Sequence, residues 1–164
     1  MLFSAGIITV SDKGSRGERV DTSGPEIRKI LSELPFLQVA AYDIVPDEAD
    51  LISLKIIEYT DVKKISLVLT TGGTGVSPRD VTPEATLSVL HREIRGMAET
   101  MRRESSMKTP HAMISRAVTG IRGQSLIINL PGSPRGAREN LDVLIPALKH
   151  TLEKIQGDPT ECAS

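Results

Sequence analysis

Residues 66–86 read SLVLTTGGTGVSPRDVTPEAT, and this stretch decides which fold the chain can adopt. Residues 66–70 are almost wholly apolar, which is typical of a central parallel strand that is covered on both faces. The glycines of residues 72–75 then let the backbone turn tightly and bring N–H groups close to an anion. Thr82 and Pro83 predict the start of a helix, with Thr82 as its N-cap. The stretch therefore predicts a strand, a loop and a helix in succession.

The glycine content alone leaves two interpretations of this loop open. It is either a phosphate-binding loop, to which Thr71 and Thr74 add hydroxyl donors, or a plain turn between a strand and a helix. Two known phosphate motifs are excluded. Pro78 stands where the dinucleotide fingerprint needs its third glycine, and the chain has no Walker-type glycine-lysine-serine or glycine-lysine-threonine sequence. A phosphate bound here is therefore expected to be held by a different scheme.

Strand and helix patterns alternate on both sides of this stretch. Short apolar strands are expected at residues 3–10, 38–45 and 124–130. One helix is expected to begin at Pro25, one after a cap at Asp47, and one at Pro134 after a cap at Ser133. Two more are expected over residues 96–107 and 146–155. The positions expected to face the core are Ile27, Ile30, Leu31, Leu34, Leu51, Ile52, Leu54, Ile56, Leu141 and Leu144.

This alternation predicts an α/β fold of three layers, in which a mostly parallel sheet carries helices on both faces. Residues 1–164 are expected to form a single domain, with the tail frayed from about residue 156. Ligands of such sheets bind beyond the carboxyl ends of the strands. Polar loops follow the predicted strands at residues 11–12, 46–47, 72–80 and 129–133. The sequence therefore predicts one site, built from these loops, at one edge of the sheet.

Two acidic residues in these loops suggest a magnesium site. Asp80 follows the glycine loop, where a carboxylate beside phosphates needs a cation between them, and Mg²⁺ commonly takes one or two carboxylates together with phosphate oxygens. Asp47 supplies a second carboxylate from a neighbouring loop. The alternatives are an Asx turn or an ion pair with Arg79 for Asp80, and a plain helix cap for Asp47. Asp12 is a weaker candidate, because Ser-Asp in such a loop is more often a turn.

Two further segments are candidates for binding a substrate. Pro131, Gly132 and Ser133 precede a helix whose unpaired N–H groups favour an anion, although a capped helix start alone also explains them. Ser105 and Ser106 end a helix in which core packing of the methionines is the default interpretation, and their hydroxyls are suited to a polar heterocycle.

Composition argues against several classes of partner. Twenty Lys and Arg balance 21 Asp and Glu, and the chain has two Phe, two Tyr and no Trp, so no nucleic-acid partner is expected. A basic signal-peptide segment is absent, and no apolar run reaches the ~20 residues that span a bilayer, so no membrane partner is expected. Cys162 is the only cysteine, which indicates a reducing cytoplasm, and the three histidines are too scattered for a zinc site.

Six blocks of sequence together identify a family. They are TVSD at residues 9–12, DTSGP at 21–25, IVPDE at 44–48, LTTGGTGVSPRDVTPEAT at 69–86, MISR at 113–116 and LIINLPGSP at 126–134. With these blocks the chain closely resembles the MogA and MoaB proteins of molybdenum-cofactor biosynthesis and the G domain of gephyrin. The resemblance runs from about residue 7 to 155, and the glycine-loop block is its most specific part.

The resemblance implies a trimeric α/β protein that binds molybdopterin and ATP with Mg²⁺. It implies adenylyl transfer to molybdopterin, with release of pyrophosphate, and a molybdenum-insertion protein as a further partner. The aspartates matching Asp47 and Asp80 are tied to catalysis and metal binding in this family. Residues 72–75 are implied to line the substrate pocket, and residues 105–110, with Ser105 and Ser106, to bind the pterin. For the reaction itself, we expect Ser11 and Asp12 to border the nucleotide and residues 131–133 to close the other side. The alternative is a carrier of the same fold that binds molybdopterin without catalysis.

Overall fold

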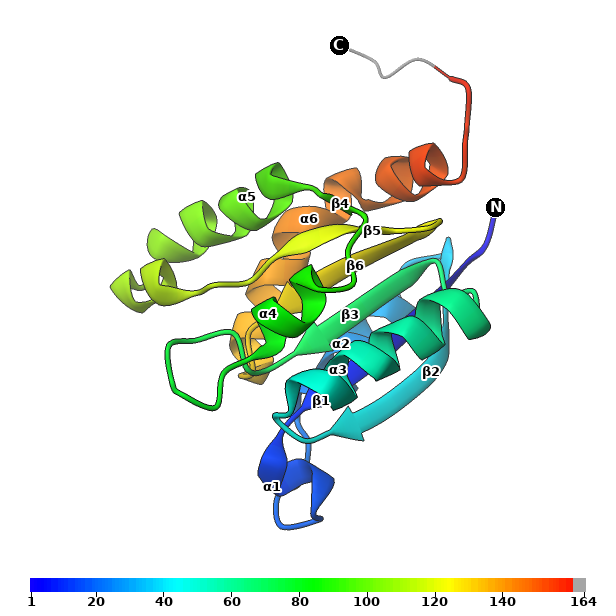
Figure 1. Ribbon diagram of the computed structural model, residues 1–164. Coiled ribbons are helices and arrows are strands. Elements are labelled where there is room, and N and C mark those ends of the chain that lie inside the picture. Colours follow the sequence, from blue (N-terminus) through cyan, green and yellow to red (C-terminus); the bar gives the residue numbers. More distant parts are fainter. Residues whose placement is uncertain (161–164) are drawn as a thin grey trace.

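The computed structural model describes residues 1–160, which contain one six-stranded sheet in the order β2-β1-β3-β6-β5-β4 (Figure 1). The strands β1 (Phe3–Val10), β2 (Leu37–Val45), β3 (Leu67–Thr71) and β6 (Ser125–Leu130) run parallel. Only β5 (Thr119–Arg122) runs against its neighbours, β6 and the two-residue β4 (Arg92–Glu93). The predicted mostly parallel sheet is confirmed, and β1 has the predicted bounds.

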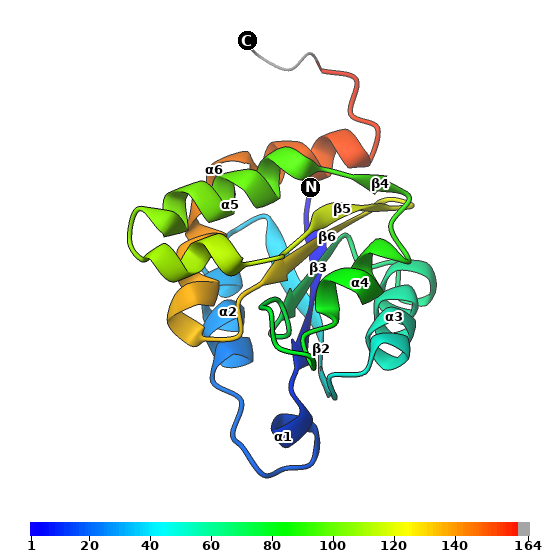
Figure 2. The same cartoon turned by 60° about the vertical axis from the view of Figure 1, so that its left-hand side comes forward.

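Helices cover both faces of the sheet (Figures 1 and 2). On one face lie α2 (Ser23–Ser32), α5 (Arg95–Ser106) and α6 (Pro134–Ile155), and on the other α3 (Ala49–Ile57) and α4 (Thr82–Leu87). Successive residues of a strand point to opposite faces, so Ile7 packs with the first group of helices and Ile8 with the second. Both side chains are fully buried, which explains why the inner strands are apolar throughout.

Two predictions about the helix interiors are wrong. In α3, Ile52 and Ile56 are buried as expected, but Leu51 is 41% exposed and Leu54 61% exposed. Residues four apart share one face of a helix, and the face that Ile52 and Ile56 occupy is the one that meets the sheet. The second error concerns α6, which continues through Pro146 as a single helix. Buried leucines on both sides of this proline hold the two halves against the sheet.

The remaining elements are short. They are α1 (Asp12–Ser15), the π-helical turn η1 (Glu58–Val62) after α3 and the 3-10 turn η2 (Pro110–Ile114) after α5. The α6 helix ends close to the predicted start of the tail, and Cys162 lies outside the described residues. Within residues 1–160, no helix is both long and apolar enough to cross a membrane.

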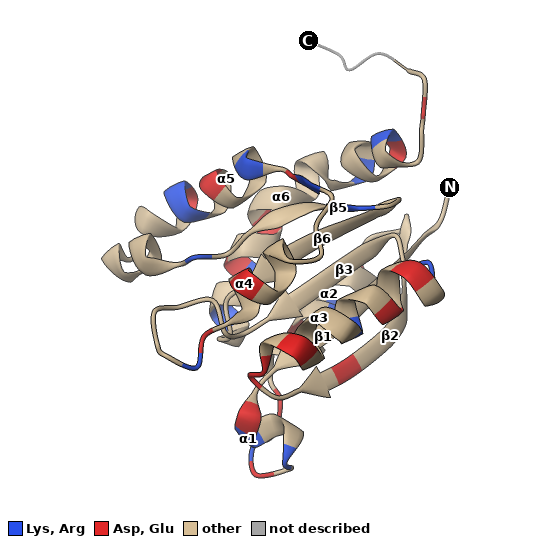
Figure 3. Cartoon of the chain, viewed as in Figure 1, with Lys and Arg blue, Asp and Glu red and all other residues tan. Residues whose placement is uncertain are grey.

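The parallel strands bring their carboxyl ends to one edge of the sheet. From β1 the sheet continues to β2 on one side and to β3 on the other, so the order of the strands reverses there. A reversal of this kind opens a crevice between the loops that leave in opposite directions. In Figure 1, α1 and the loop before α4 extend beyond this edge, and the red segments of Figure 3 mark acidic residues on α1 and between β2 and α3.

Candidate active site

A cavity of about 470 Å³ opens at the carboxyl edge of the sheet. Its walls come from the ends of β1 and β3, the segment before α2 and the start of α6. Of the predicted site residues, the structure brings together seven around this cavity: Ser11, Asp47, Thr71, Gly72, Gly73, Gly132 and Ser133. Asp12, Thr74, Gly75, Asp80, Ser105, Ser106 and Pro131 are not among the residues that line it.

The backbone of the glycine loop lies in close contact with the backbone of neighbouring segments. Gly72 has a φ of 104° and Gly73 a φ of 67°, both in the region that favours glycine. A Cβ on Gly72 would lie 2.4 Å from the carbonyl oxygen of Val10, and one on Gly132 would lie 3.2 Å from the Cα of Gly72. The ends of β1, β3 and β6 therefore meet where side chains have no room, which leaves backbone at the floor of the cavity.

Two threonine hydroxyls fix this bend. Thr71 donates to the carbonyl oxygen of Pro131 (2.7 Å), and Thr82 donates to that of Gly72 (2.9 Å). The Thr71 hydroxyl thus joins the two loops, and its role as a donor to an anion stays a prediction. Thr82 is not the N-cap of α4, a position that Val81 occupies. The predicted Ser133 cap of α6 is confirmed, since Ser133 Oγ accepts from the Gly136 N–H (3.0 Å).

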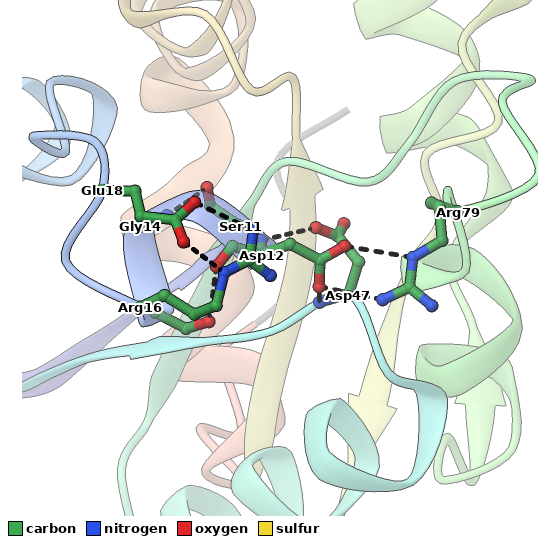
Figure 4. Close-up of polar contacts among 8 residues, drawn as sticks. Ser11, Asp12, Gly14, Arg16, Glu18, Asp47 and Arg79 are labelled. Atoms are coloured by element: carbon green, nitrogen blue, oxygen red, sulfur yellow. Dashed lines mark hydrogen bonds and ion pairs between the residues drawn. The ribbon is translucent and has the colours of Figure 1, made fainter.

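Asp12 and Asp47 bind each other's backbone (Figure 4). The Asp12 N–H donates to Asp47 Oδ2, and the Asp47 N–H donates to Asp12 Oδ1, both at 2.9 Å. Arg79 reaches across from the loop before α4 and donates to both oxygens of Asp12, at 2.9 and 3.0 Å. Arg79 thus pairs with Asp12 and not with Asp80. Asp47 is not the helix cap that the sequence suggests either, because Glu48 occupies that position of α3.

This arrangement drives the pKa values of the two carboxyls apart. The hydrogen bonds from Arg79, and then from the Asp47 backbone, lower the pKa of Asp12. Burial raises the pKa of Asp47. The hydrogen bond from the Asp12 backbone lowers this pKa, whereas the charges of Asp12 and Asp80 raise it. Asp47 is therefore a partly desolvated carboxylate beside two others, an environment that an added cation would stabilise.

Asp80 contacts the same glycine loop as Asp47, two residues further along the chain, at Gly75. Its Oδ2 accepts from the Ser77 N–H (2.9 Å), three residues earlier, which differs from the Asx turn weighed as an alternative, because an Asx turn bonds the backbone two residues further on. A Cβ on Gly75 would lie 2.8 Å from Asp80 Oδ2, and one on Gly73 would lie 3.2 Å from Asp47 Oδ1. The two carboxylates thus both lie against one glycine loop, each at a glycine.

These residues fit a magnesium ion that is shared with phosphates. Among residues 1–160, no group of three or more His, Cys, Asp or Glu side chains could hold a metal ion. Asp47 and Asp80 both reach the backbone of the glycine loop, at Gly73 and Gly75, so their carboxylates converge on the segment where phosphates are expected. Mg²⁺ keeps few protein ligands and completes its shell with water and phosphate oxygens. The donor set suits an ion that arrives with its phosphates.

The serines at the end of α5 lie apart from the main cavity. Ser106 is exposed and donates to the carbonyl oxygen of Arg103 (2.8 Å), whereas Ser105 Oγ is buried and has no hydrogen-bond partner among residues 1–160. The next residues, Lys108 and Thr109, line a second cavity of about 330 Å³. That cavity shares Ser133 with the first one, so this segment is a neighbour of the site.

Sequence reasoning missed an acidic residue that shapes the cavity wall. Asp21 accepts hydrogen bonds from Thr9 Oγ1 (2.7 Å), the Tyr42 hydroxyl, and the backbone of Ser23 and Gly24 (3.1 and 3.2 Å). Burial opposes its charge, but the hydrogen bonds outweigh burial and lower the pKa of the Asp21 carboxyl. In the sequence, Asp21 is marked only by the DTSGP block at residues 21–25, and no role is predicted for that block.

Asp21→Asn is expected to lower the free energy of unfolding by about 1–2 kcal/mol at pH 7, because the hydrogen bonds to a charged acceptor are weakened in a partly exposed site. A lowered pKa in the folded state means that this stabilisation is present above the ordinary pKa of 3.8 and is lost as the pH falls through the lower folded value. Urea unfolding at pH 7 and near pH 3 measures both effects.

Asp50→Asn is the matched control for this prediction, since Asp50 is an exposed acid on α3. It should change the free energy of unfolding by less than about 0.5 kcal/mol at either pH. A constant difference between Asp21→Asn and the unsubstituted chain at both pH values would contradict the role of the Asp21 charge.

Comparisons with known proteins show which family this chain is similar to. Residues 6–150 match the model of a family described as "Probable molybdopterin binding domain". The chain is 43% identical over 154 residues to the molybdopterin adenylyltransferase of Helicobacter pylori strain J99, which covers 93% of this chain and 88% of that protein. It is 44% identical over 163 residues to gephyrin from Dictyostelium discoideum, covering 94% of this chain but 23% of that much longer protein.

Solved structures show the same fold. The molybdopterin biosynthesis enzyme MoaB from Thermus thermophilus superimposes with a TM-score of 0.91 at 51% identity, covering 98% of this chain and 100% of that one. The family match spans most of the sequence, and its ends enclose every loop that forms the cavity. The chain therefore belongs to the molybdopterin-binding domain family, as its sequence resemblance predicts.

Proposed function

We propose that this chain transfers AMP from ATP to the phosphate of molybdopterin, forming adenylyl-molybdopterin and pyrophosphate. The observation that carries the proposal is the pair of carboxylates, Asp47 and Asp80, that lie against Gly73 and Gly75 of one glycine loop, with Asp47 and Gly73 lining the main cavity. A site for two polyanions needs close backbone approach and a way to neutralise charge, and this edge offers both. The Helicobacter pylori relative is named for this reaction.

The reaction is an in-line displacement at the α-phosphorus of ATP. An oxygen of the molybdopterin phosphate forms the new bond to this phosphorus, while the bond from the phosphorus to the oxygen leading to the β-phosphate breaks. The electron pair of that bond leaves with pyrophosphate. Because the attacking phosphate is already anionic, no strong general base is needed. The protein contributes positioning and electrostatic stabilisation.

Each part of the site has a separate task in this scheme. The bend at Gly72 and Gly73 lets phosphate oxygens approach the backbone, and Ser133, with the start of α6, forms the opposite wall. Asp47 and Asp80 would hold Mg²⁺, which when bound neutralises the charge of the ATP phosphates. The pair of Asp12 and Arg79 keeps the Asp47 backbone in place. Ser105 and Ser106 remain candidates for the pterin, next to the second cavity.

The assembly and the compartment are part of the proposal. We propose a homotrimer in a reducing cytoplasm that passes its product to a molybdenum-insertion protein. Sedimentation equilibrium tests the trimer: a monomer at micromolar concentration would contradict it.

The test of the function is to incubate the protein with molybdopterin, Mg²⁺ and ATP labelled at the α-phosphate. The expected result is one labelled adenylyl group on molybdopterin for each pyrophosphate released. A carrier would bind molybdopterin in a binding assay but would release no pyrophosphate. Omission of Mg²⁺ is the control, and turnover that persists without any divalent cation would remove the roles given to Asp47 and Asp80.

A further inference from the structure

The block MISR at residues 113–116 has no task in the scheme above, although its arginine lies against the site. Arg116 follows η2 and precedes β5, and it contacts the loop that carries Asp80 at several points. Its Nε donates to the carbonyl oxygen of Gly75, and its Nη2 donates to that of Asp80, both at 2.7 Å. Its backbone N–H donates to the carbonyl oxygen of Thr74 (2.8 Å), and its Nη1 forms an ion pair with Glu84.

These contacts close the loop at both ends. The two carbonyl groups that share one guanidinium belong to the residue that begins the loop and the residue that ends it. Between them, residues 76–79 are exposed, and Val76 is 64% exposed, so apolar burial does not anchor this segment. A guanidinium is planar and presents its donors at fixed spacing. It therefore sets the separation of the Gly75 and Asp80 backbones.

Arg116 is itself supported by α5. Arg102 of that helix donates to the carbonyl oxygens of Ala117 (2.8 Å) and Ser115 (3.5 Å), on either side of Arg116 in the chain. The backbone around Arg116 is thus tied to a helix that packs in the core, and Arg116 extends this support to the Asp80 loop. Neither arginine lines the main cavity.

We propose that Arg116 is a positioning residue, which fixes the loop of residues 75–80 so that Asp80 meets the cation and phosphates at the glycine bend. The inference rests on the proposed function for the task of Asp80, but the ordering of the loop is independent of any reaction. Lysine is not expected to replace Arg116, because one ammonium group cannot hold both carbonyl groups in a fixed plane.

Amide hydrogen exchange of the unliganded protein tests the ordering of the loop. Arg116→Ala is expected to speed exchange of the amides in residues 75–80 by about 10-fold, with Arg116→Lys in between. Arg122→Ala is the matched control. Arg122 also pairs with an acid, Asp61, and donates to a backbone carbonyl, that of Val89, but it lies on β5 away from this loop. It should leave exchange in residues 75–80 unchanged.

A double-mutant cycle tests whether Arg116 acts through Asp80. Arg116→Ala alone should lower turnover by about 10-fold, since small displacements of a reacting group are costly. In an Asp80→Asn background the same change should lower turnover less than about 2-fold, because the group that Arg116 positions is already lost. Added guanidinium ion at non-denaturing concentration should restore part of the turnover of Arg116→Ala and none of that of Asp80→Asn.

Two results would overturn the proposal. One is loop exchange that stays the same in Arg116→Ala and Arg116→Lys. The other is a pair of turnover losses that multiply in the double variant, which would show that Arg116 acts independently of Asp80. If the unsubstituted protein released no pyrophosphate, the proposed function would fail, and the exchange measurement would still decide whether Arg116 orders the loop.

Discussion

Asp80→Asn is expected to lower adenylyl transfer by at least ~100-fold, which corresponds to ~2.7 kcal/mol of activation free energy. Asp80 lies against Gly75, as Asp47 lies against Gly73, so it provides the second of the two charges proposed to hold the cation. Asparagine keeps the shape of the side chain and removes the charge. Binding of molybdopterin should be unchanged within about 2-fold, because that substrate does not depend on this carboxylate in the proposed scheme.

The fold of the variant should be intact, since an asparagine oxygen can still accept the Ser77 N–H that Asp80 Oδ2 accepts at 2.9 Å. Steady-state pyrophosphate release and thermal unfolding, measured on the same preparation, separate loss of activity from loss of structure. Asp158→Asn is the control, because Asp158 also accepts a local backbone N–H, from Thr160 at 2.8 Å, but lies beyond α6. A fully active Asp80→Asn protein would remove Asp80 from the mechanism.

The placement of Asp80 and Asp47 at one edge could be predicted from the sequence, and the reason is topological. Apolar runs at residues 3–10 and 66–70 have the period and length of buried strands, and parallel strands with helical connections deliver their following loops to the same edge. The glycines at residues 72 and 73 likewise predicted a bend that only glycine adopts, and both have positive φ. Patterns over short stretches of sequence were sufficient for these features.

Contacts between distant residues could not be predicted in this way. Arg79 and Asp12 are 67 positions apart, and Arg116 and Gly75 are 41 apart. The residues next to each arginine in the sequence do not indicate a partner, because an arginine in a polar loop is usually a solvated charge. The same limit explains Thr71, whose hydroxyl was visible in the sequence while its acceptor, Pro131, was not.

Short helices and strands could not be predicted for a different reason. β4 has two residues and β5 has four, so neither is long enough to show the period of two that marks a strand. α1 has four residues within a polar loop. The polar segment from residue 11 to 23 also conceals Asp21, which no local pattern reveals because its partners include side chains on β1 and β2.

Gly72→Ala is expected to have the largest effect on stability of any single methyl addition to the site. Gly72 has a φ of 104°, which costs an alanine on the order of 1–2 kcal/mol. The added Cβ would also lie 2.4 Å from the carbonyl oxygen of Val10, a backbone atom that cannot move without shifting β1. Together these effects should lower the free energy of unfolding by about 3 kcal/mol or more, or Tm by roughly 6–12 °C.

Gly17→Ala separates strain from collision in this prediction. Gly17 also has a positive φ, 73°, but an added Cβ there meets no atom within 4 Å. Gly17→Ala should lower the free energy of unfolding by the backbone strain alone, about 1 kcal/mol, or Tm by roughly 2–4 °C. The difference between the two variants then measures how rigidly β1 and β3 are held against each other at the floor of the cavity. If Gly72→Ala cost no more than Gly17→Ala in thermal unfolding, the strand ends could separate easily. A bend that yields so readily could not fix phosphates between Asp47 and Asp80, so the stability of this one variant also tests the site.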